Sequence, residues 1–317
     1  MTANLPSEPA AAKRPSASSA GFVRSSDGTE LHFDRQGVGR SVLLCDGLLC
    51  DGHIWKYVAP ALCGECDLLH WHYPGHGESQ DPPEQADVGP KRLADDAALV
   101  ARSAGFDRVT VLGHSLGVQV ALELWRRHRG IVDGLVLICG SPGNIVRDFH
   151  ENAVLKWLVP VVDVAGRFLP SAVTALWRRI PSDPLLWLAM HSREVNTRLI
   201  KTADLAQYFG RLGRVEIRLA LRFLEAAGHH DATPFLRDID VPVLVVAAEQ
   251  DRFTPAQRSR FMASAIPGAE LLMVPQGTHS LPIEQPEIVN LRIRRFLRER
   301  LDPPAAAATN PRPRPSE

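Results

Sequence analysis

The stretch RVTVLGHSLGVQVALELWRRH, residues 108–128, decides the fold of this chain. It begins as an apolar run typical of a buried strand, passes through GHSLG at residues 113–117, and continues with apolar residues at helical spacing. Gly-x-Ser-x-Gly is a weak signal alone, but a turn from strand to helix gives it a mechanical purpose. Ser115 must adopt a strained conformation to project its Oγ above the sheet, and Gly113 and Gly117 lack the Cβ atoms that would clash. We therefore predict that Ser115 is a nucleophile rather than a serine that merely lies near the start of a helix.

Apolar runs of strand length recur on both sides of this stretch. They are near-continuously hydrophobic, as parallel strands covered on both faces should be, and helix-period segments lie between them. This alternation predicts a mostly parallel α/β sheet of eight strands with helices on both faces. The expected strands are an antiparallel hairpin at 21–37, turning at Asp27-Gly28, and the runs 41–47, 66–75, 108–115, 134–141, 241–251 and 269–279. The expected helices are 53–62, 91–104, 116–129, 255–265 and 284–300.

One interval, residues 142–232, interrupts the alternation because it has helical patterns and no strand-like run. We predict a helical cap inserted over the carboxyl edge of the sheet, where open α/β sheets bind ligands. Trp157, Trp177 and Trp187 lie in this interval, either in a packing face or lining an apolar pocket. The predicted core is then residues 21–141 and 233–301, between disordered tails at 1–20 and 302–317 that are rich in Ala, Ser and Pro.

The composition is that of a soluble globular protein. Among 317 residues, 36 Lys and Arg balance 36 Asp and Glu, so charge gives no reason to expect a nucleic acid or an anionic membrane as partner. No apolar run reaches the length of a spanning helix, and the N-terminal residues lack the apolar segment of a secretory signal. The five cysteines are odd in number and the chain is too long to need disulfide staples, which favours free thiols and a cytoplasmic location. The oligomeric state stays open.

A nucleophilic serine needs a base, and the base needs an acid that orients it. Asp251 follows a strand in VPVLVVAAEQDRFTP, and His279 lies in the loop after the last strand in VPQGTHSLPIEQPE. We predict that His279 takes the proton of Ser115, and that Asp251 holds the imidazole tautomer and stabilises its charged form. Glu249 is a competing acid, expected within the strand end rather than in the loop. Two further acids precede their strand and are expected at the wrong sheet edge, Asp238 and Asp240.

These residues carry a resemblance to a known family. GHSLG, YPGHGES (73–79), EQDRFTP (249–255) and GTHSLPIEQPE (277–287) are similar to the motifs of the α/β-hydrolase superfamily, in its capped group of lipases, esterases and epoxide hydrolases. The resemblance covers most of the chain outside the cap. It implies a hydrolase with neither cofactor nor metal, in which the backbone amides of Leu48 and Leu116 form an oxyanion hole. Epoxide hydrolases and haloalkane dehalogenases are disfavoured, because their nucleophile is Asp and here it is Ser115.

The chain departs from the family's pattern at two positions. The family commonly has His-Gly after the third strand, where this chain has Asp46-Gly47, and commonly has an Asp where this chain has His72. A carboxylate aimed at the oxyanion would oppose it, so we predict that Asp46 points away and accepts backbone N–H bonds within its loop. The residues expected to support the site are Asp46, Gly47, Gly113, His114 and Gly117.

Three other clusters could bind or react, and each has an ordinary structural alternative. Cys63 and Cys66 have the spacing of a redox or zinc pair, but no second pair follows. The histidines of HWHYPGH lie on a predicted buried strand or in a turn, and no carboxylate follows at ligand spacing, so a metal site is disfavoured. The sequence at 229–231, His-His-Asp, either lines a pocket or forms a solvated turn. The histidines of HWHYPGH are His70, His72 and His76.

The favoured function is hydrolysis of a carboxylic ester with an apolar acyl or aromatic group, through an acyl-enzyme. Thioester hydrolysis, lactone opening, carbon–carbon bond hydrolysis and haloperoxidase-type perhydrolysis stay open, because the same apparatus serves them. A non-catalytic ligand-binding protein is the alternative of a different class, and a membrane-associated lipase is a third possibility. The expected partner is a small-molecule substrate, with no nucleic acid and no integral membrane segment.

Overall fold

A computed structural model of the chain describes residues 18–144, 195–212 and 214–302. Its elements follow the predicted alternation, and each strand after the hairpin ends one to five residues before the end of its apolar run. The strands are β1 (Ser19–Arg24), β2 (Glu30–Gly37), β3 (Arg40–Cys45), β4 (Cys66–Trp71), β5 (Val109–His114), β6 (Val132–Ile138), β7 (Val243–Ala248) and β8 (Glu270–Val274). The α-helices are α1 (Val58–Leu62), α2 (Pro90–Ser103), α3 (Leu116–Arg127), α8 (Thr202–Leu212), α9 (Ile217–His229), α10 (Ala256–Ala265), α11 (Leu281–Glu284) and α12 (Pro286–Phe296). Short turns of other helix types are η1 (His53–Trp55), η2 (Arg129–Ile131), η4 (Thr233–Asp238) and η5 (Leu297–Leu301).

The eight strands form one sheet in the order β1-β2-β4-β3-β5-β6-β7-β8. β2 pairs antiparallel with β1 and β4, and all other neighbours pair parallel, so the predicted sheet is confirmed. The hairpin turns at Gly28, whose φ of 92° suits glycine. Pairing of β3 with β5 places Cys45 opposite Gly113. The residues that follow these two strands therefore meet at one edge of the sheet.

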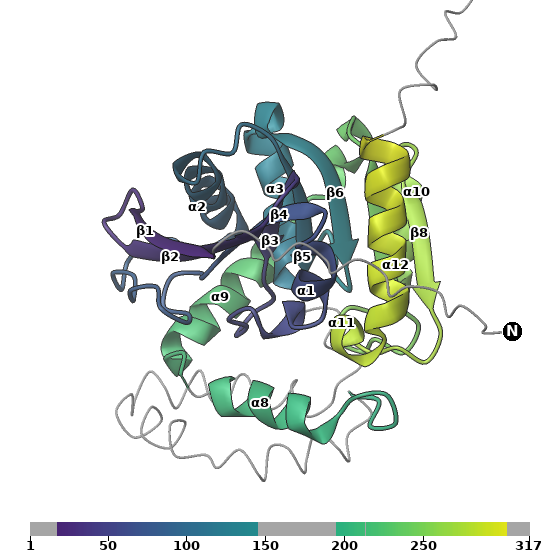
Figure 1. The fold of residues 1–317 in the computed structure, drawn as a ribbon. Coiled ribbons are helices and arrows are strands. Elements are labelled where there is room, and N and C mark those ends of the chain that lie inside the picture. The colour runs from purple at the N-terminus through teal and green to yellow at the C-terminus, as the bar shows by residue number, and fades with distance from the viewer. Residues whose placement is uncertain (1–17, 145–194, 213, 303–317) are drawn as a thin grey trace, which may run out of the picture.

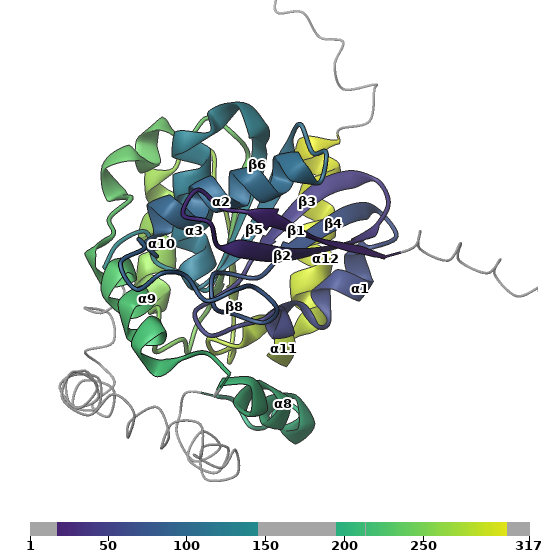
Figure 2. The same ribbon diagram turned by 90° about the vertical axis from the view of Figure 1, so that its left-hand side faces the viewer.

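Helices cover both faces of the sheet (Figures 1 and 2). On one face, α2, α3 and α10 share a buried core with strand residues such as Val111 and Leu135. On the other face, α1 and α12 share a second core with Leu112 and Val136. Neighbouring residues of a strand point to opposite faces, so the continuous apolar runs supply both cores.

The carboxyl ends of the parallel strands face the interval between β6 and β7. In Figure 1 the arrows of β6 and β8 point toward the end of the molecule where α8 lies, and α9 leads from there back to the core. Lys56 and Tyr57 tie α8 to the core by bonds of 2.6 and 2.8 Å to Asp204. Both α-helices described in this interval, α8 and α9, agree with a helical insertion. Residues 145–194 of the predicted cap, with its three tryptophans, lie outside the described residues, as do most of the two predicted tails.

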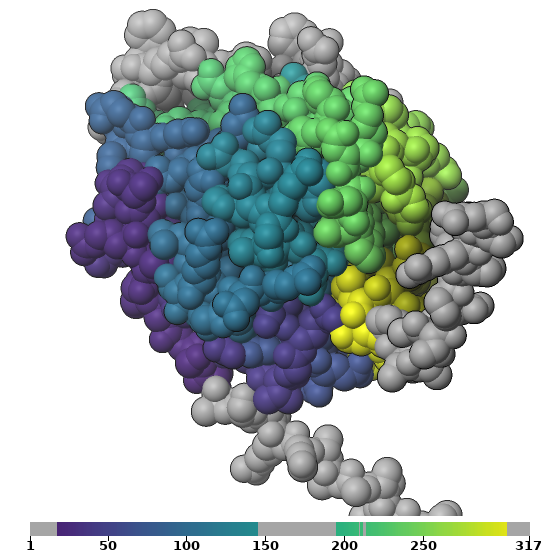
Figure 3. All heavy atoms as spheres, turned by 90° about the horizontal axis from the view of Figure 1, so that it is seen from above, coloured from purple at the N-terminus to yellow at the C-terminus, as the bar shows by residue number. Residues whose placement is uncertain are grey.

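The parts of the core before and after this interval adjoin each other. Seen from above, the purple-to-teal surface of the first part meets the green-to-yellow surface of the second (Figure 3). The core extends slightly beyond its predicted bounds, because β1 begins at Ser19 and Arg40 forms an ion pair with Asp302. None of the helices in the described segments has the length and the apolar character needed to cross a membrane.

Candidate active site

Ser115 occupies a sharp turn between β5 and α3. Its backbone has φ 55° and ψ −114°, a conformation that is strained for a residue with a side chain. Its N–H donates to the Ile138 carbonyl of β6 at 3.1 Å, and its carbonyl accepts the Val118 N–H at 3.0 Å. The neighbouring strand and the first turn of α3 thus hold the strained residue in place.

Close backbone contacts explain the glycines around Ser115. A Cβ on Gly117 would lie 2.1 Å from the carbonyl oxygen of Cys45, and one on Gly113 would lie 2.3 Å from the carbonyl oxygen of Gly117. A Cβ on Gly47 would lie 3.2 Å from the Cβ of Ser115. The chain that leaves β3 therefore runs directly past the serine.

Replacing Gly117 by alanine should destabilise the fold by about 1–3 kcal/mol, the usual cost of overpacking a close-packed site. The added methyl meets a backbone carbonyl, so no side-chain rotation can relieve the contact. Urea unfolding measures the loss. Gly64→Ala is the matched control, because a Cβ there meets no atom within 4 Å. Equal stability of the two variants would contradict the packing argument.

The structure brings Ser115, His279 and Asp251 together from three separate loops. The Nε2 of His279 lies 2.9 Å from the Oγ of Ser115. On the other side of the ring, Nδ1 lies 2.9 Å from Oδ2 of Asp251 and 3.2 Å from its Oδ1. Because a carboxylate can only accept, Nδ1 carries a proton and the neutral ring presents the lone pair of Nε2 to the serine. This tautomer is the one that can take a proton from Ser115.

The buried carboxylate of Asp251 is fixed by donors from its own loop. Its Oδ1 accepts the N–H groups of Phe253 at 2.9 Å and Thr254 at 2.8 Å, and its Oδ2 accepts the Thr254 hydroxyl at 2.8 Å. The expectation that Glu249 lies within the strand is wrong: β7 ends at Ala248, and Glu249 follows it as an exposed residue. Asp238 and Asp240 precede β7, and Asp240 accepts the indole N–H of Trp125 at 3.2 Å.

His114 supports the loop of His279. Its Nε2 donates to the backbone carbonyl of His279 at 2.9 Å. Burial, together with the nearby His279, lowers the pKa of His114 to about 3, so its ring is neutral at ordinary pH. The contact ties the residue before the serine to the backbone of the histidine that binds the serine.

Two backbone amides flank the serine and have no partner in the described part of the chain. Leu116 begins α3, where the first N–H groups of a helix have no partner within the helix. Leu48 lies in the turn after β3, which is closed by a 3.3 Å bond from the Cys50 N–H to the Gly47 carbonyl. Both N–H groups are therefore free of protein partners among the described residues.

The chain is similar to known proteins along most of its length. A sequence profile described as alpha/beta hydrolase fold matches residues 40–286. The chain belongs to the α/β-hydrolase family. A protein from Rhizobium rhizogenes named "Putative carbamate hydrolase RutD" is 24% identical over 277 residues, which are 85% of this chain and 98% of that protein.

Solved structures share the fold of this α/β-hydrolase. A thermophilic esterase from Thermogutta terrifontis is 24% identical with a TM-score of 0.69, over 89% of this chain and 98% of that one. The enol-lactonase from Burkholderia xenovorans LB400 is 19% identical with a TM-score of 0.71, over 87% and 99% of the two chains. At these identities the likeness shows the fold and not the substrate.

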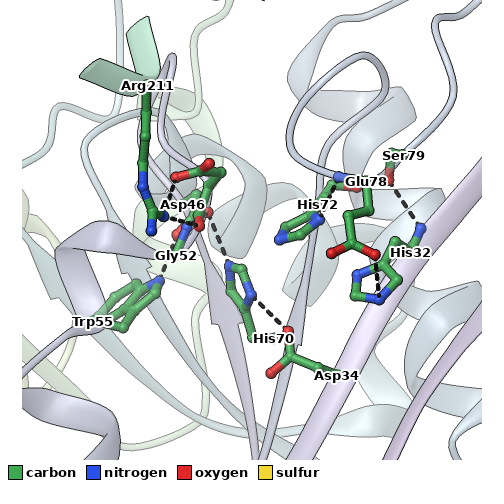
Figure 4. Close-up of polar contacts among 11 residues, drawn as sticks. His32, Asp34, Asp46, Gly52, Trp55, His70, His72, Glu78, Ser79 and Arg211 are labelled. Carbon is green, nitrogen blue, oxygen red and sulfur yellow. Dashed lines mark hydrogen bonds and ion pairs between the residues drawn. The ribbon is translucent and has the colours of Figure 1, made fainter. Parts of the chain in front are cut away.

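Asp46 stands where the family commonly has histidine, and its side chain is enclosed by donors (Figure 4). Its Oδ2 accepts the Gly52 N–H at 2.8 Å, which confirms the predicted backbone bond within the loop. Its Oδ1 accepts the indole N–H of Trp55 at 2.6 Å, and Oδ2 also lies 2.9 Å from Nε2 of His70. The last two partners were not predicted, because they come from η1 and β4 rather than from the turn itself.

His70 lies on β4 and His72 follows the last residue of that strand, and the two rings carry different charges. Burial opposes a charge on His70, but Asp46 and Asp34 outweigh it and raise its pKa to about 10. Burial and the neighbouring charge on His70 lower the pKa of His72 to about 4. The neutral ring of His72 accepts the Glu78 N–H on Nδ1 at 2.9 Å.

A group with the composition of a metal site lies beside them. His32, Asp34 and His72 offer ligand atoms that all lie within 4.8 Å of one another. The carboxylate missing from the local sequence is therefore supplied by β2, whose Asp34 pairs with His70 across the sheet. A metal-bound histidine usually donates through its second ring nitrogen, whereas Nδ1 of His72 accepts from Glu78, which places its proton on Nε2. This tautomer makes His72 a donor toward the cluster rather than a ligand.

The remaining groups named from the sequence have structural contacts. Cys63 and Cys66 are free thiols, as are the other three cysteines. His76 is buried in its turn, with Nδ1 3.0 Å from the Pro74 carbonyl. A solvated turn is wrong for His230, which is buried 2.9 Å from Glu123, although the preceding residue is exposed.

Proposed function

We propose that this α/β-hydrolase cleaves carboxylic esters through an acyl-enzyme formed on Ser115. The observation that carries the proposal is the 2.9 Å contact of His279 Nε2 with Ser115 Oγ, on a ring whose other nitrogen faces Asp251. A serine, a base in hydrogen-bond reach and an acid that orients the base are the parts that nucleophilic acyl transfer needs.

In the first half of the reaction, Oγ of Ser115 attacks the ester carbonyl carbon and its proton passes to Nε2 of His279. The carbonyl oxygen becomes an oxyanion that accepts the N–H groups of Leu48 and Leu116. When the intermediate collapses, the bond to the alcohol oxygen breaks and His279 returns the proton to that oxygen. The alcohol leaves and the acyl group stays on Ser115.

In the second half, a water molecule takes the place of the alcohol. It gives one proton to Nε2 of His279 and attacks the acyl carbon, and the same two amides hold the oxyanion. Collapse releases the carboxylic acid, and the proton returns to Oγ of Ser115. The Asp251 carboxylate stays ionised throughout and stabilises the imidazolium that forms twice in each cycle.

The ester class is the part of the proposal that geometry constrains least. An apolar acyl or aromatic group is favoured by the tryptophans at 157, 177 and 187 in the chain between β6 and α8. A carbamate ester is the second candidate, because the curated relative from Rhizobium rhizogenes carries that substrate class in its name and matches 85% of this chain. The same attack on a carbonyl carbon would cleave either bond.

A matched pair of substrates distinguishes the two classes. We expect p-nitrophenyl esters of two to twelve carbons to be hydrolysed, with kcat/KM at least about tenfold higher than for the p-nitrophenyl N-alkylcarbamate of equal length. Binding of one added methylene in an apolar pocket is worth about 1–3 kcal/mol, so the chain-length profile also reports the depth of the acyl pocket. Faster turnover of the carbamates would favour the second candidate.

Labelling with a fluorophosphonate tests the enzyme reading itself. The reagent should modify Ser115 in the folded protein and should not modify the urea-unfolded chain. Absence of labelling together with absence of turnover would favour a non-catalytic ligand-binding protein. Turnover that rises sharply on adding a lipid interface would favour a lipase.

A further inference from the structure

The negative charge of Asp46 lies close to the place where the proposed mechanism forms an oxyanion. Its carboxylate is 1% exposed and directly precedes Gly47 and Leu48, the residues that run past Ser115. A buried anion at this position would repel the oxyanion that forms on the substrate, unless a cation compensates it nearby.

His70 supplies that cation. Its Nε2 lies 2.9 Å from Oδ2 of Asp46, and its Nδ1 lies 3.1 Å from Oδ2 of Asp34 (Figure 4). An ionised carboxylate can only accept a hydrogen bond, so each ring nitrogen must donate and the ring carries a positive charge. The His70 ring is buried and so is Asp46, whereas Asp34 is partly exposed, so the bond to Asp46 is the better shielded from water.

The Asp46 carboxylate connects this cation to the loop that carries Leu48. Besides His70, it binds the Gly52 N–H at the far end of the loop and the Trp55 indole in η1. The backbone carbonyl of Asp46 accepts the Tyr73 hydroxyl at 2.8 Å, so the start of the loop is held as well. Gly52 packs against His70 so closely that a Cβ would lie 2.9 Å from the ring carbon Cε1.

We propose that His70 is a positioning residue for the oxyanion hole: it neutralises Asp46 and, through Asp46, holds the loop at 46–52 so that the Leu48 N–H faces the oxyanion. The expected effect on kcat rests on the proposed acyl-transfer function. The expected ordering of the loop at 46–52 rests on the contacts alone. Asp34 supports His70 from the neighbouring strand β2. None of these three side chains is expected to touch the substrate.

The kinetic test replaces His70 by alanine. We expect kcat for a p-nitrophenyl ester to fall about 10- to 100-fold with KM within about twofold, below the roughly 10²–10³-fold cost of deleting an oxyanion donor outright. His32→Ala is the matched control, because His32 is a buried histidine on β2 that contacts Glu78 and stacks on His72 rather than binding Asp46. It should lose stability without a comparable loss of kcat.

Two rescues separate the charge role from a packing role. Adding Asp46→Asn to His70→Ala removes the uncompensated charge and should recover about 5-fold in kcat, whereas Asp46→Asn alone should lower kcat.

A cavity of about 400 Å³ opens beside His70, lined also by Asp34, Gly52 and Trp55, so added imidazole can reach the vacated position. Imidazole should restore kcat of His70→Ala below about pH 7, where imidazole is protonated. The rate of the His70→Ala, Ser115→Ala double variant with imidazole is subtracted, because it measures hydrolysis that does not use Ser115.

The pH dependence of stability tests the charge on His70 with a variant, Asp34→Asn, that disturbs the fold less than His70→Ala. The pKa of His70 is raised to about 10 from its ordinary 6.5, so its contribution to stability is complete below pH 6.5 and is lost as the pH rises through 10. Asp34→Asn should move this loss to lower pH, measured from the ring protons of His70 by NMR. Among the described residues, the other titratable groups near the ring are His32 on β2, Asp46 after β3, His72 after β4, and Asp51, His53, Lys56 and Arg211 around the cavity.

Hydrogen exchange tests whether His70 holds the loop at 46–52, and it needs no substrate turnover. Amides at 46–52 should exchange at least about tenfold faster in His70→Ala than in wild type or His32→Ala. If wild type hydrolyses nothing but this loosening is seen, the proposed function fails and the positioning role of His70 stands. If His70→Ala matches His32→Ala in both kcat and exchange, the inference is overturned.

Discussion

Replacing Ser115 by alanine should lower kcat/KM for the best ester substrate by about 10⁴–10⁶-fold, the range seen when a serine nucleophile is deleted from an intact site. The variant keeps His279 and both amides, so residual hydrolysis would come from water attack assisted by the oxyanion hole. Its melting temperature should stay close to that of wild type, because within the described residues the hydroxyl has a single partner, His279 at 2.9 Å.

Ser259→Ala is the matched control for this result. Ser259 is also a buried serine, but it lies on α10 and its hydroxyl has no partner within the described residues. It should keep wild-type kcat/KM. A Ser115→Ala enzyme that retained more than about a tenth of the activity would show that the reaction does not pass through this serine, because deletion of a nucleophile lowers the rate far more than tenfold.

The part of the site that depends on local sequence could be predicted. Ser115 lies between a strand and a helix that are adjacent in the chain, and the close contacts of Gly113 and Gly117 follow from that turn alone. Asp251 and His279 each follow a strand of a parallel sheet, whose carboxyl ends meet at one edge. Strand order was therefore enough to place the three side chains near one another, and the structure brings them into contact.

The partners of Asp46 could not be predicted in the same way. The sequence predicted a backbone N–H bond to Asp46 within its loop, and in the structure the donor is Gly52, six residues along the chain. The bond to His70 depends on β3 lying beside β4, and the bond of His70 to Asp34 depends on the antiparallel register of β2 with β4. Spacing along HWHYPGH cannot show a carboxylate that arrives from another strand.

One of the two departures from the family's pattern, Asp46, takes part in this pairing. The family's histidine follows β3 and its acid follows β4, whereas this chain has the acid Asp46 after β3 and histidines on and after β4. The partner of Asp46 is His70, on β4 itself, rather than the His72 that stands at the family's acidic position. A buried acid on one strand end and a buried histidine on the adjacent strand could have suggested the pair.

Replacing Asp251 by asparagine should lower kcat/KM by about 10⁴-fold, the loss known for an orienting acid when the triad geometry is kept but the histidine tautomer is wrong. The N–H groups of Phe253 and Thr254 both point at Oδ1, so the amide oxygen of the introduced asparagine should take that position. The NH₂ group then faces Nδ1 of His279 and donates to it. The imidazole proton is forced onto Nε2, which can no longer accept the proton of Ser115.

Glu249→Gln tests whether Asp251 rather than Glu249 orients His279. Glu249 is exposed and lies just past β7, so its replacement should leave kcat/KM within about twofold of wild type. The rate of fluorophosphonate labelling should follow the same order, because it also needs Ser115 to give up its proton to His279. A larger loss for Glu249→Gln than for Asp251→Asn would transfer the orienting role to Glu249. Equal and small losses would mean that His279 is held in its working tautomer by other contacts, of which the 3.4 Å approach of the Thr254 hydroxyl to Nδ1 is the nearest available.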